Sequence, residues 1–199
     1  MSSEGPTDRE LLERYVAGDA RAFDLIVDRY ERRVYAIALR MCGDPDDARD
    51  VSQTVFINAL RALPGFREEA QLSTWFHRVA VNASLDHLRK QKRQPTDPLD
   101  SVGDRPSEGP SPEDRAVSAV RAAEVQAALR RLSDEHRAVL VLHDIQDLDY
   151  AGVAHALDIP VGTVKSRIHR ARLELAKLLG HLRETSEGTE RSSGPSNKR

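Results

Sequence analysis

Residues 159–173 carry the side chains best suited to binding a charged ligand. This segment holds four basic residues and one histidine but no acidic residue. Apolar residues recur at helical spacing within and beyond it, which predicts a helix with a buried face of Val164, Ile168, Ala171 and Leu175. A phosphate backbone releases counterions when such a cluster of cations binds it. The segment therefore indicates nucleic-acid binding.

A turn and a second helix come directly before this basic helix. Residues 150–157 predict a short amphipathic helix, and Asp158-Ile159-Pro160 separates the two. Asp158 tolerates the left-handed backbone that a tight turn requires. Helices joined in this way form a helix-turn-helix, whose second helix enters the major groove of DNA. A solvated basic face on a structural helix is the alternative, and the preceding helix and turn favour DNA reading over it.

The polar residues of the basic helix divide by position. Those placed to reach base edges are Thr163, Ser166, Arg167 and Arg170. Those that flank them, and that we expect to contact phosphates, are Lys165, His169 and Arg172.

An aromatic, an amide and several cations share one stripe of another predicted helix, over residues 73–93. Its members, at steps of three or four, are Trp75, Arg78, Asn82, Asp86, Arg89 and Arg93. Aromatic rings stack on unpaired bases, amides hydrogen-bond an extruded base, and arginines follow phosphates, so the stripe indicates binding of single-stranded DNA. Two alternatives stay open: Trp75 could belong to the core, and the cations of residues 89–93 could complement the helix dipole.

Acidic residues gather where a further helix is expected to begin, after the break at Gly43-Asp44-Pro45. They are Asp44, Asp46, Asp47 and Asp50. An acidic first turn complements the helix dipole, but this does not account for Gln53 or for an exposed Phe56. A protein-docking face is the other interpretation, and both stay open on the residues alone.

Composition limits the class of protein. Of the 199 residues, 39% are hydrophobic, 31% are charged and only 5% are aromatic, which suits a helix-rich protein better than a large β-sandwich. The net charge of −2 means that any nucleic-acid contact must come from local basic clusters. The single cysteine excludes a disulfide within the chain. The polar N-terminus and the lack of a long apolar run predict a cytoplasmic protein without membrane insertion.

No constellation of catalytic residues stands out. The sequence has no nucleotide-binding glycine loop, no metal-ligand spacing and no nucleophile–base pattern. We therefore predict no enzyme activity, no catalytic residue, no cofactor and no metal.

These patterns predict an all-α protein of two small helical domains, joined by a flexible Pro-rich linker, with a C-terminal helix-turn-helix. The domains are expected over residues 8–93 and 116–183, and the linker over 94–115. The segments 1–7 and 184–199 are expected to be disordered. The predicted helix N-caps are Asp8, Asp44, Ser73 and Ser133.

Three segments in this order resemble the extracytoplasmic-function (ECF) sigma factors of bacterial RNA polymerase. Asp50–Phe56 resembles the segment that binds the clamp helices of the β′ subunit, Ser73–Arg89 the segment that melts and reads the −10 element, and Pro160–Arg172 the −35 recognition helix. The similarity covers roughly residues 8–182. Within the family the chain looks most like the actinobacterial sigma-M type. It departs from many members in having Gly152 in place of a glutamate and Asp158 in place of a turn glycine.

The resemblance implies a promoter-recognition subunit that binds the polymerase core, including its β flap, and promoter DNA. It also implies a cognate anti-sigma factor and a stress or envelope response. The implied core-binding residues are Asp47, Asp50, Gln53 and Phe56. The implied −10 residues, which include a loop over residues 66–72 that accepts a flipped base, are Phe66, Arg67, Gln71, Trp75, Arg78, Asn82, Arg89 and Lys90. The seven polar residues of the basic helix would read the −35 element.

Two other classes of protein compete with this interpretation. A dimeric repressor or activator would bind duplex DNA without polymerase and through a symmetric dimer. A helical adaptor would keep its partner after Arg167 and Arg170 are replaced. Neither class needs the segments 50–56 and 75–82, which favour the sigma factor.

Overall fold

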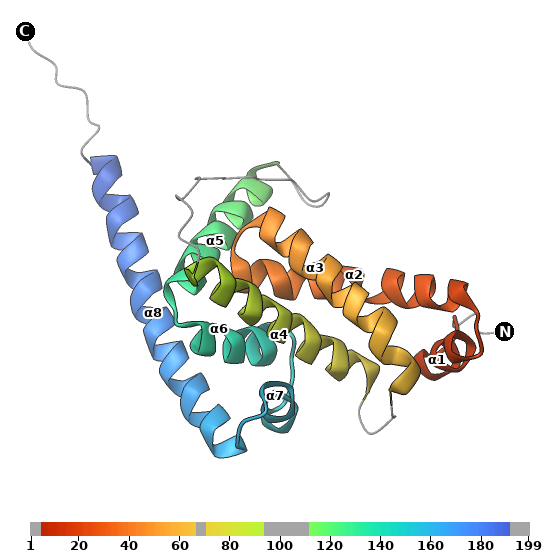
Figure 1. Cartoon of the computed structure of the whole chain (residues 1–199). Coiled ribbons are helices and arrows are strands. Elements are labelled where there is room, and N and C mark those ends of the chain that lie inside the picture. The colour runs from red at the N-terminus through yellow and green to blue at the C-terminus, as the bar shows by residue number, and fades with distance from the viewer. Residues whose placement is uncertain (1–4, 67–70, 94–111, 192–199) are drawn as a thin grey trace, which may run out of the picture.

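Helices account for all the regular structure in the described residues. The structure, a computed structural model, describes residues 5–66, 71–93 and 112–191. Within these ranges the helices of Figure 1 are α1 (Asp8–Val16), α2 (Ala20–Cys42), α3 (Pro45–Ala62), η1 (Leu63–Gly65), α4 (Leu72–Arg93), α5 (Pro112–Arg131), α6 (Asp134–Leu140), η2 (Val141–Ile145), α7 (Tyr150–Leu157) and α8 (Val161–Arg191). The predicted all-α class is confirmed. The expected linker lies almost entirely outside the described residues.

Local capping explains where several helices begin. Asp44 caps α3 by accepting from the backbone amides of residues 46 and 47, and Ser133 caps α6, as predicted. The prediction of Asp8 as a cap is wrong. Thr7 caps α1 instead, because its hydroxyl accepts from the amide of Glu10 while the Glu10 carboxylate accepts from the Thr7 amide at 2.7 Å. The prediction for Ser73 is also wrong, since α4 already begins at Leu72.

The N-terminal helices pack around one aromatic ring. Phe76 of α4 is fully buried and stacks on Tyr30 of α2 with ring centroids 4.4 Å apart. Trp75 and Phe56 contact the same ring from α4 and α3, at 5.1 and 5.8 Å. Because α2, α3 and α4 all contribute to this cluster, it holds α3 and α4 together as a pair.

The C-terminal helices contain the predicted helix-turn-helix. Asp158 ends α7 with φ 54° and ψ 50°, the left-handed conformation expected of the turn. Val164, Ile168 and Ala171 form the buried face of α8, as their spacing predicts. The helix continues to Arg191, past the expected domain end at residue 183, because the sequence there has no proline to stop it.

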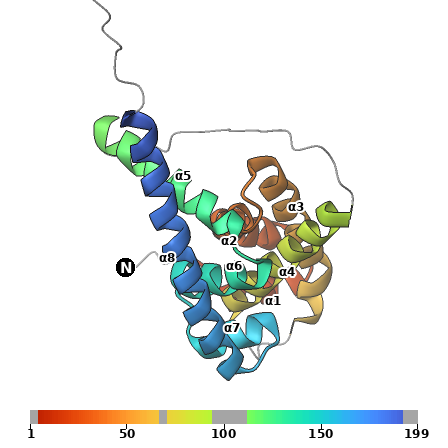
Figure 2. The same cartoon turned by 90° about the vertical axis from the view of Figure 1, so that its left-hand side faces the viewer.

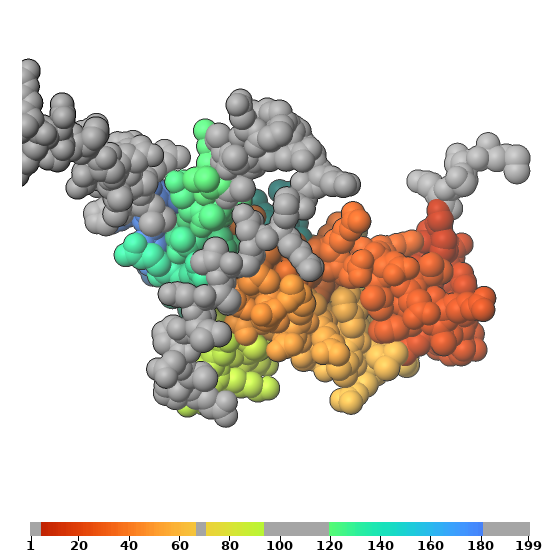
Figure 3. Space-filling view, turned by 90° about the horizontal axis from the view of Figure 1, so that it is seen from above, coloured from red at the N-terminus to blue at the C-terminus, as the bar shows by residue number. Residues whose placement is uncertain are grey.

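The two groups of helices are in contact. α7 packs on α4, and α5 and α6 pack on α2, so that the buried apolar side chains form one continuous cluster. Figure 2 looks onto α8, with α5 and α6 between it and the N-terminal helices. In Figure 3 the green and teal residues of the C-terminal group lie directly against the orange surface of α2 and α3.

Polar groups of the C-terminal helices satisfy the last carbonyls of α2. The Gln126 amide donates to the carbonyl oxygens of Leu39 and Arg40, at 3.2 and 3.3 Å. The Arg137 guanidinium donates to that of Met41. The final turn of a helix leaves its carbonyls without partners inside the helix. The C-terminal group therefore completes the end of α2.

Candidate nucleic-acid interface

A groove of about 470 Å³ runs between α3 and α4. Four of the eight residues predicted to bind an opened DNA strand line it from α4, and they are Trp75, Arg78, Asn82 and Lys90. From α3 the polar residues Thr54 and Asn58 line the opposite wall. A mixture of apolar wall and a few converging polar groups is typical of a binding site.

Trp75 is anchored in the fold and also lines the groove. Its ring is half-buried and meets the rings of Phe66 and Phe76 edge-on, with centroids 5.9 and 5.1 Å apart. Core packing and base stacking are therefore compatible for Trp75, because one part of its ring packs on the core and another part lines the groove. An anchored ring costs little conformational entropy when a base stacks on it.

Three polar residues of the α4 wall are available to a ligand. Arg78, Asn82 and Lys90 are exposed, and none of them bonds to another side chain within the described residues. Arg78 and Lys90 bring positive charge to the groove, whereas the carboxylate of Asp86 is paired with Arg89 at 2.7 Å. The groove can therefore hold a phosphate near a free cation and a base near a free amide.

Of the other four predicted strand-binding residues, three are described and none of these lines the groove. Phe66 is half-buried against Trp75, and Arg89 does not line the groove. Gln71 is exposed and lines a different cavity, which lies between α2, α4 and the segment that joins η2 to α7. Arg67 lies outside the described residues.

The polar face of α8 divides into paired and unpaired cations. Arg167 is half-buried and forms an ion pair with Glu135 of α6 at 2.8 Å. Arg172 pairs with Asp144, and this hydrogen bond raises the pKa of Arg172. Arg170 is exposed and has no partner within the described residues. Of the arginines on this face, Arg170 is thus the one most available to DNA.

The remaining residues of that face surround Arg170. Lys165, Ser166 and His169 are exposed, and the Lys165 ammonium lies 5.6 Å from the centre of the Tyr150 ring. Thr163 is half-buried, and its carbonyl accepts from the Ser166 hydroxyl at 3.0 Å. The first turns of α8, called the exposed end of α8 below, can present a cation, a hydroxyl and an imidazole to a DNA groove.

The four residues predicted to bind the polymerase core lie on α3, and the structure places them differently. The carboxylate of Asp47 contacts the His87 imidazole at 2.9 Å and the Gln91 amide at 2.8 Å, which ties α3 to α4. Asp50 and Gln53 are exposed. The expectation that Phe56 is exposed is wrong, since its ring is half-buried against Phe76.

Two apolar residues on α3 were missed by the sequence analysis. Ile57 and Leu60 are 45% and 48% exposed, beside the Gln53 face. The core positions Val51, Val55 and Ala59 recur every four residues, so Ile57 falls on the opposite side of the helix. This register could have identified Ile57, whereas Leu60 reads as part of the apolar stripe. Exposed apolar residues beside polar ones are typical of a protein-docking face.

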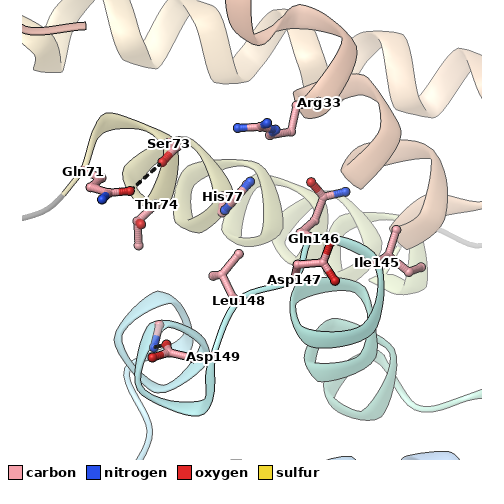
Figure 4. A pocket seen from close by; sticks show the side chains of 11 residues that line it. Arg33, Gln71, Ser73, Thr74, His77, Ile145, Gln146, Asp147, Leu148 and Asp149 are labelled. Carbon is pink, nitrogen blue, oxygen red and sulfur yellow. Dashed lines mark hydrogen bonds between the residues drawn. The ribbon is translucent and has the colours of Figure 1, made fainter.

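The cavity between the two groups of helices contains a buried histidine. It measures about 570 Å³, and Figure 4 shows His77 of α4 between Arg33 of α2 and Leu148. His77 is 5% exposed, and neither of its ring nitrogens has a hydrogen-bond partner among the described residues. Burial, assisted by the Arg33 charge, lowers the pKa of His77 to about 4. The imidazole is therefore neutral at pH 7.

Neither a metal site nor a membrane-spanning helix is found in the described residues. Among them no three His, Cys, Asp or Glu side chains are grouped as a metal site would require. No helix in those ranges combines the length and the apolar character needed to cross a membrane.

Comparison with known proteins identifies both groups of helices. Residues 26–94 match the family described as Sigma-70 region 2, and residues 122–175 match Sigma-70, region 4. The chain is 42% identical to the ECF RNA polymerase sigma factor SigM of Mycobacterium tuberculosis, over 88% of this chain and 86% of that protein. Its fold is similar to that of CnrH in complex with the cytosolic domain of CnrY, with a TM-score of 0.64, 26% identity and coverage of 87% and 97% of the two chains. It is also similar to the sigma factor RpoE of Bartonella quintana in complex with the anti-sigma factor NepR, with a TM-score of 0.66, 24% identity and coverage of 81% and 98%.

Proposed function

Because the chain belongs to the family of extracytoplasmic-function sigma factors of RNA polymerase, we propose that it binds the polymerase core and directs it to promoters by reading DNA at two separate surfaces. The family is one of transcription regulators, and we propose that this chain has no catalysis of its own and acts in the cytoplasm. The observation that supports the proposal is that two separate surfaces carry groups suited to DNA. They are the α3–α4 groove, lined by Trp75, Arg78 and Asn82, and the exposed side of α8 that carries Lys165, Ser166 and Arg170.

The α3–α4 groove suits the opened strand of the −10 element. Trp75 offers a ring on which a base can stack, Asn82 offers a free amide, and Arg78 offers a free cation. Duplex DNA hides its Watson–Crick edges, so a narrow groove with these groups favours a single strand. We assign this role to residues 8–93, and we extend it to the flanking Phe66, Arg67 and Gln71.

The exposed end of α8 suits the duplex −35 element. A recognition helix enters the major groove with its N-terminal residues, and Ser166 and Arg170 lie on the exposed side of α8. Lys165, His169 and Arg172 flank this side and would contact phosphates. Arg167 can join them only by leaving Glu135. We assign this role to residues 116–183.

Replacing Arg170 tests the −35 assignment. We expect Arg170→Ala to weaken binding to a −35 duplex by roughly tenfold, because a bidentate arginine–base contact contributes about 1–3 kcal/mol of discrimination. Fluorescence anisotropy with labelled duplexes would measure the affinity. Arg167→Ala is the matched control, and a smaller loss is expected because this arginine is engaged by Glu135. A larger loss for Arg167→Ala would assign the base contact to that residue instead.

The exposed face of α3 suits the polymerase clamp. Asp50 and Gln53 lie beside the apolar Ile57 and Leu60, which gives a mixed surface that a partner helix could cover. Asp47 and Phe56 would act there mainly by fixing α3 to α4 and to the core.

Placing a charge on that face should impair assembly. We expect Ile57→Asp to weaken binding to the polymerase core by about tenfold, since a buried apolar contact at an interface would become an unpaired charge. Val120→Asp on α5, where the native valine is 59% exposed, is the control and should bind normally. Native-gel titration of core with each variant would measure the affinity. Equal affinity of the two variants would exclude this face.

The proposal includes a cognate anti-sigma factor as regulator. CnrH, at 26% identity, is recorded in complex with the cytosolic domain of another protein, and this supports a similar partner here.

The whole proposal is tested by adding the purified chain to bacterial core polymerase on genomic fragments. Promoter-specific transcripts are expected. Operator binding by a symmetric dimer without polymerase, and no specific transcript with active core, would favour an ordinary DNA-binding regulator.

A further inference from the structure

We infer that Asn58 of α3 is a specificity-determining residue, which contacts an edge of the base held in the α3–α4 groove, across from Arg78 and one turn from Asn82. This inference rests on the proposed −10 function of the groove. It adds a residue from the helix that otherwise serves polymerase docking, so that α3 would present one side to protein and another to DNA.

The register of the two helices brings Asn58 into the groove beside Arg78. α3 and α4 run antiparallel (Figure 1), and the contact between Asp47 and His87 at 2.9 Å joins the start of α3 to the end of α4. At the other end of the groove, Ala62 and Trp75 line the wall together. Counting inward from both ends places Asn58 opposite residues 76–79, so it faces Arg78, and Asn82 lies one turn further along α4 on the same groove.

The side-chain amide of Asn58 is not used to stabilise the fold. The residue is exposed and forms no side-chain hydrogen bond within the described residues. Asparagine is also a poor helix former in a helix interior, because its amide competes for backbone hydrogen bonds. Thr54, one turn earlier, has its hydroxyl engaged by the carbonyl of Asp50 at 2.9 Å. Asn58 is therefore the polar group of the α3 wall that is free to bind a ligand.

Two amides on opposite walls suit one unstacked base. Each carboxamide carries a donor and an acceptor and can pair with a base edge that presents the complementary pair. Asn82 can meet one edge from α4 while Asn58 meets another edge of the same base from α3. Trp75 stacks near one end, and Arg78 holds the phosphate beside it. A base read on two edges is discriminated more strictly than a base read on one.

The experiment compares Asn58→Ala with the unmodified chain in complete polymerase holoenzyme. Transcription from a promoter library randomised across the −10 element, followed by sequencing of the transcripts, gives the preference for each base at each position. We expect Asn58→Ala to reduce the preference by about tenfold at one position and to leave the others unchanged. Asn82→Ala should reduce the preference at the same position. Arg61→Ala, an exposed change on α3 outside the groove, is the control and should not change the profile.

The outcomes separate this inference from the proposed function. If Asn82→Ala alters the profile and Asn58→Ala does not, the groove reads DNA without Asn58 and the inference is overturned. A uniform fall across all positions for Asn58→Ala would also overturn it, because that is the effect of a phosphate contact. If the unmodified chain shows no −10 preference at all, the proposed function fails first. Circular dichroism of each variant confirms that the exposed substitutions leave the fold intact.

Discussion

Replacing Arg137 by alanine is expected to lower the free energy of unfolding by about 3–5 kcal/mol. Arg137 is 4% exposed, and its guanidinium donates to backbone carbonyls of residues 129, 130 and 132 at 2.8, 3.0 and 3.1 Å. It also donates to the carbonyl of Met41, at the end of α2. Alanine would remove these hydrogen bonds. The Leu129 carbonyl would keep the amide of Leu132 as a donor at 3.2 Å, but a buried acceptor that loses its partner is costly.

The same substitution should weaken the contact between the two groups of helices. Arg137 holds the turn between α5 and α6 and reaches α2 from there, so its loss affects both the C-terminal fold and the contact with α2. Arg137→Lys should recover only part of the stability, because an ammonium lacks the planar fork that serves several carbonyls at once. Burial lowers the pKa of Arg137, yet an arginine remains charged at neutral pH.

Urea unfolding of the full chain, followed by circular dichroism, would measure the change. Arg131→Ala is the control, because Arg131 is exposed and six positions away, and it should change the free energy of unfolding by less than about 0.5 kcal/mol. If Arg137→Ala lowered the free energy of unfolding by no more than Arg131→Ala does, water would be replacing the guanidinium at these carbonyls without cost.

Local signals made much of the fold predictable. The helix-turn-helix follows from the spacing of Val164, Ile168 and Ala171 and from a turn residue that accepts a positive φ, and all of these act within a short stretch of chain. The stripe on α4 was predictable for the same reason, since the helical period alone brings Trp75, Arg78 and Asn82 to one wall.

Pairings between distant helices could not be predicted. In the sequence, Arg137 is one of many arginines, and its position between a polar first turn and an apolar run does not reveal that its guanidinium reaches α2. The ion pair of Arg167 with Glu135 depends on how α6 packs on α8, so the sequence did not separate Arg167 from Arg170. Asn58 was likewise missed, because its importance depends on which part of α4 faces it across the groove.

Acid should destabilise the protein through His77. Its folded-state pKa of about 4 lies below the ordinary value of 6.5, so below pH 6.5 the unfolded chain binds a proton that the folded chain does not. The stability conferred by a neutral His77 is complete above pH 6.5 and is lost as the pH falls towards 4. At pH 5 the loss from this group is expected to be about 2 kcal/mol.

Substitution by leucine isolates this effect from the titration of carboxylates. His77→Leu fills a similar space without a titratable group. Between pH 7.5 and pH 5 the unmodified chain should therefore lose about 2 kcal/mol more of its free energy of unfolding than the variant does. Urea unfolding at both pH values would measure it. A difference that does not change with pH would mean that protonated His77 finds a partner in the folded chain, for which the neighbouring Asp147 and Asp149 of the same cavity are the available carboxylates.

The position of His77 determines which part of the structure should respond first. It lies on α4 where the segment carrying Leu148 covers it, so a protonated imidazole regains water if α7 separates from α4. Partial opening costs less than global unfolding and is therefore favoured as the pH falls. Hydrogen exchange at pH 5 should show faster exchange at the start of α7 than in the α2–α3 core, and His77→Leu should abolish the difference between pH 5 and pH 7 after correction for intrinsic rates. Uniform exchange along the chain would instead indicate that the two groups of helices unfold together.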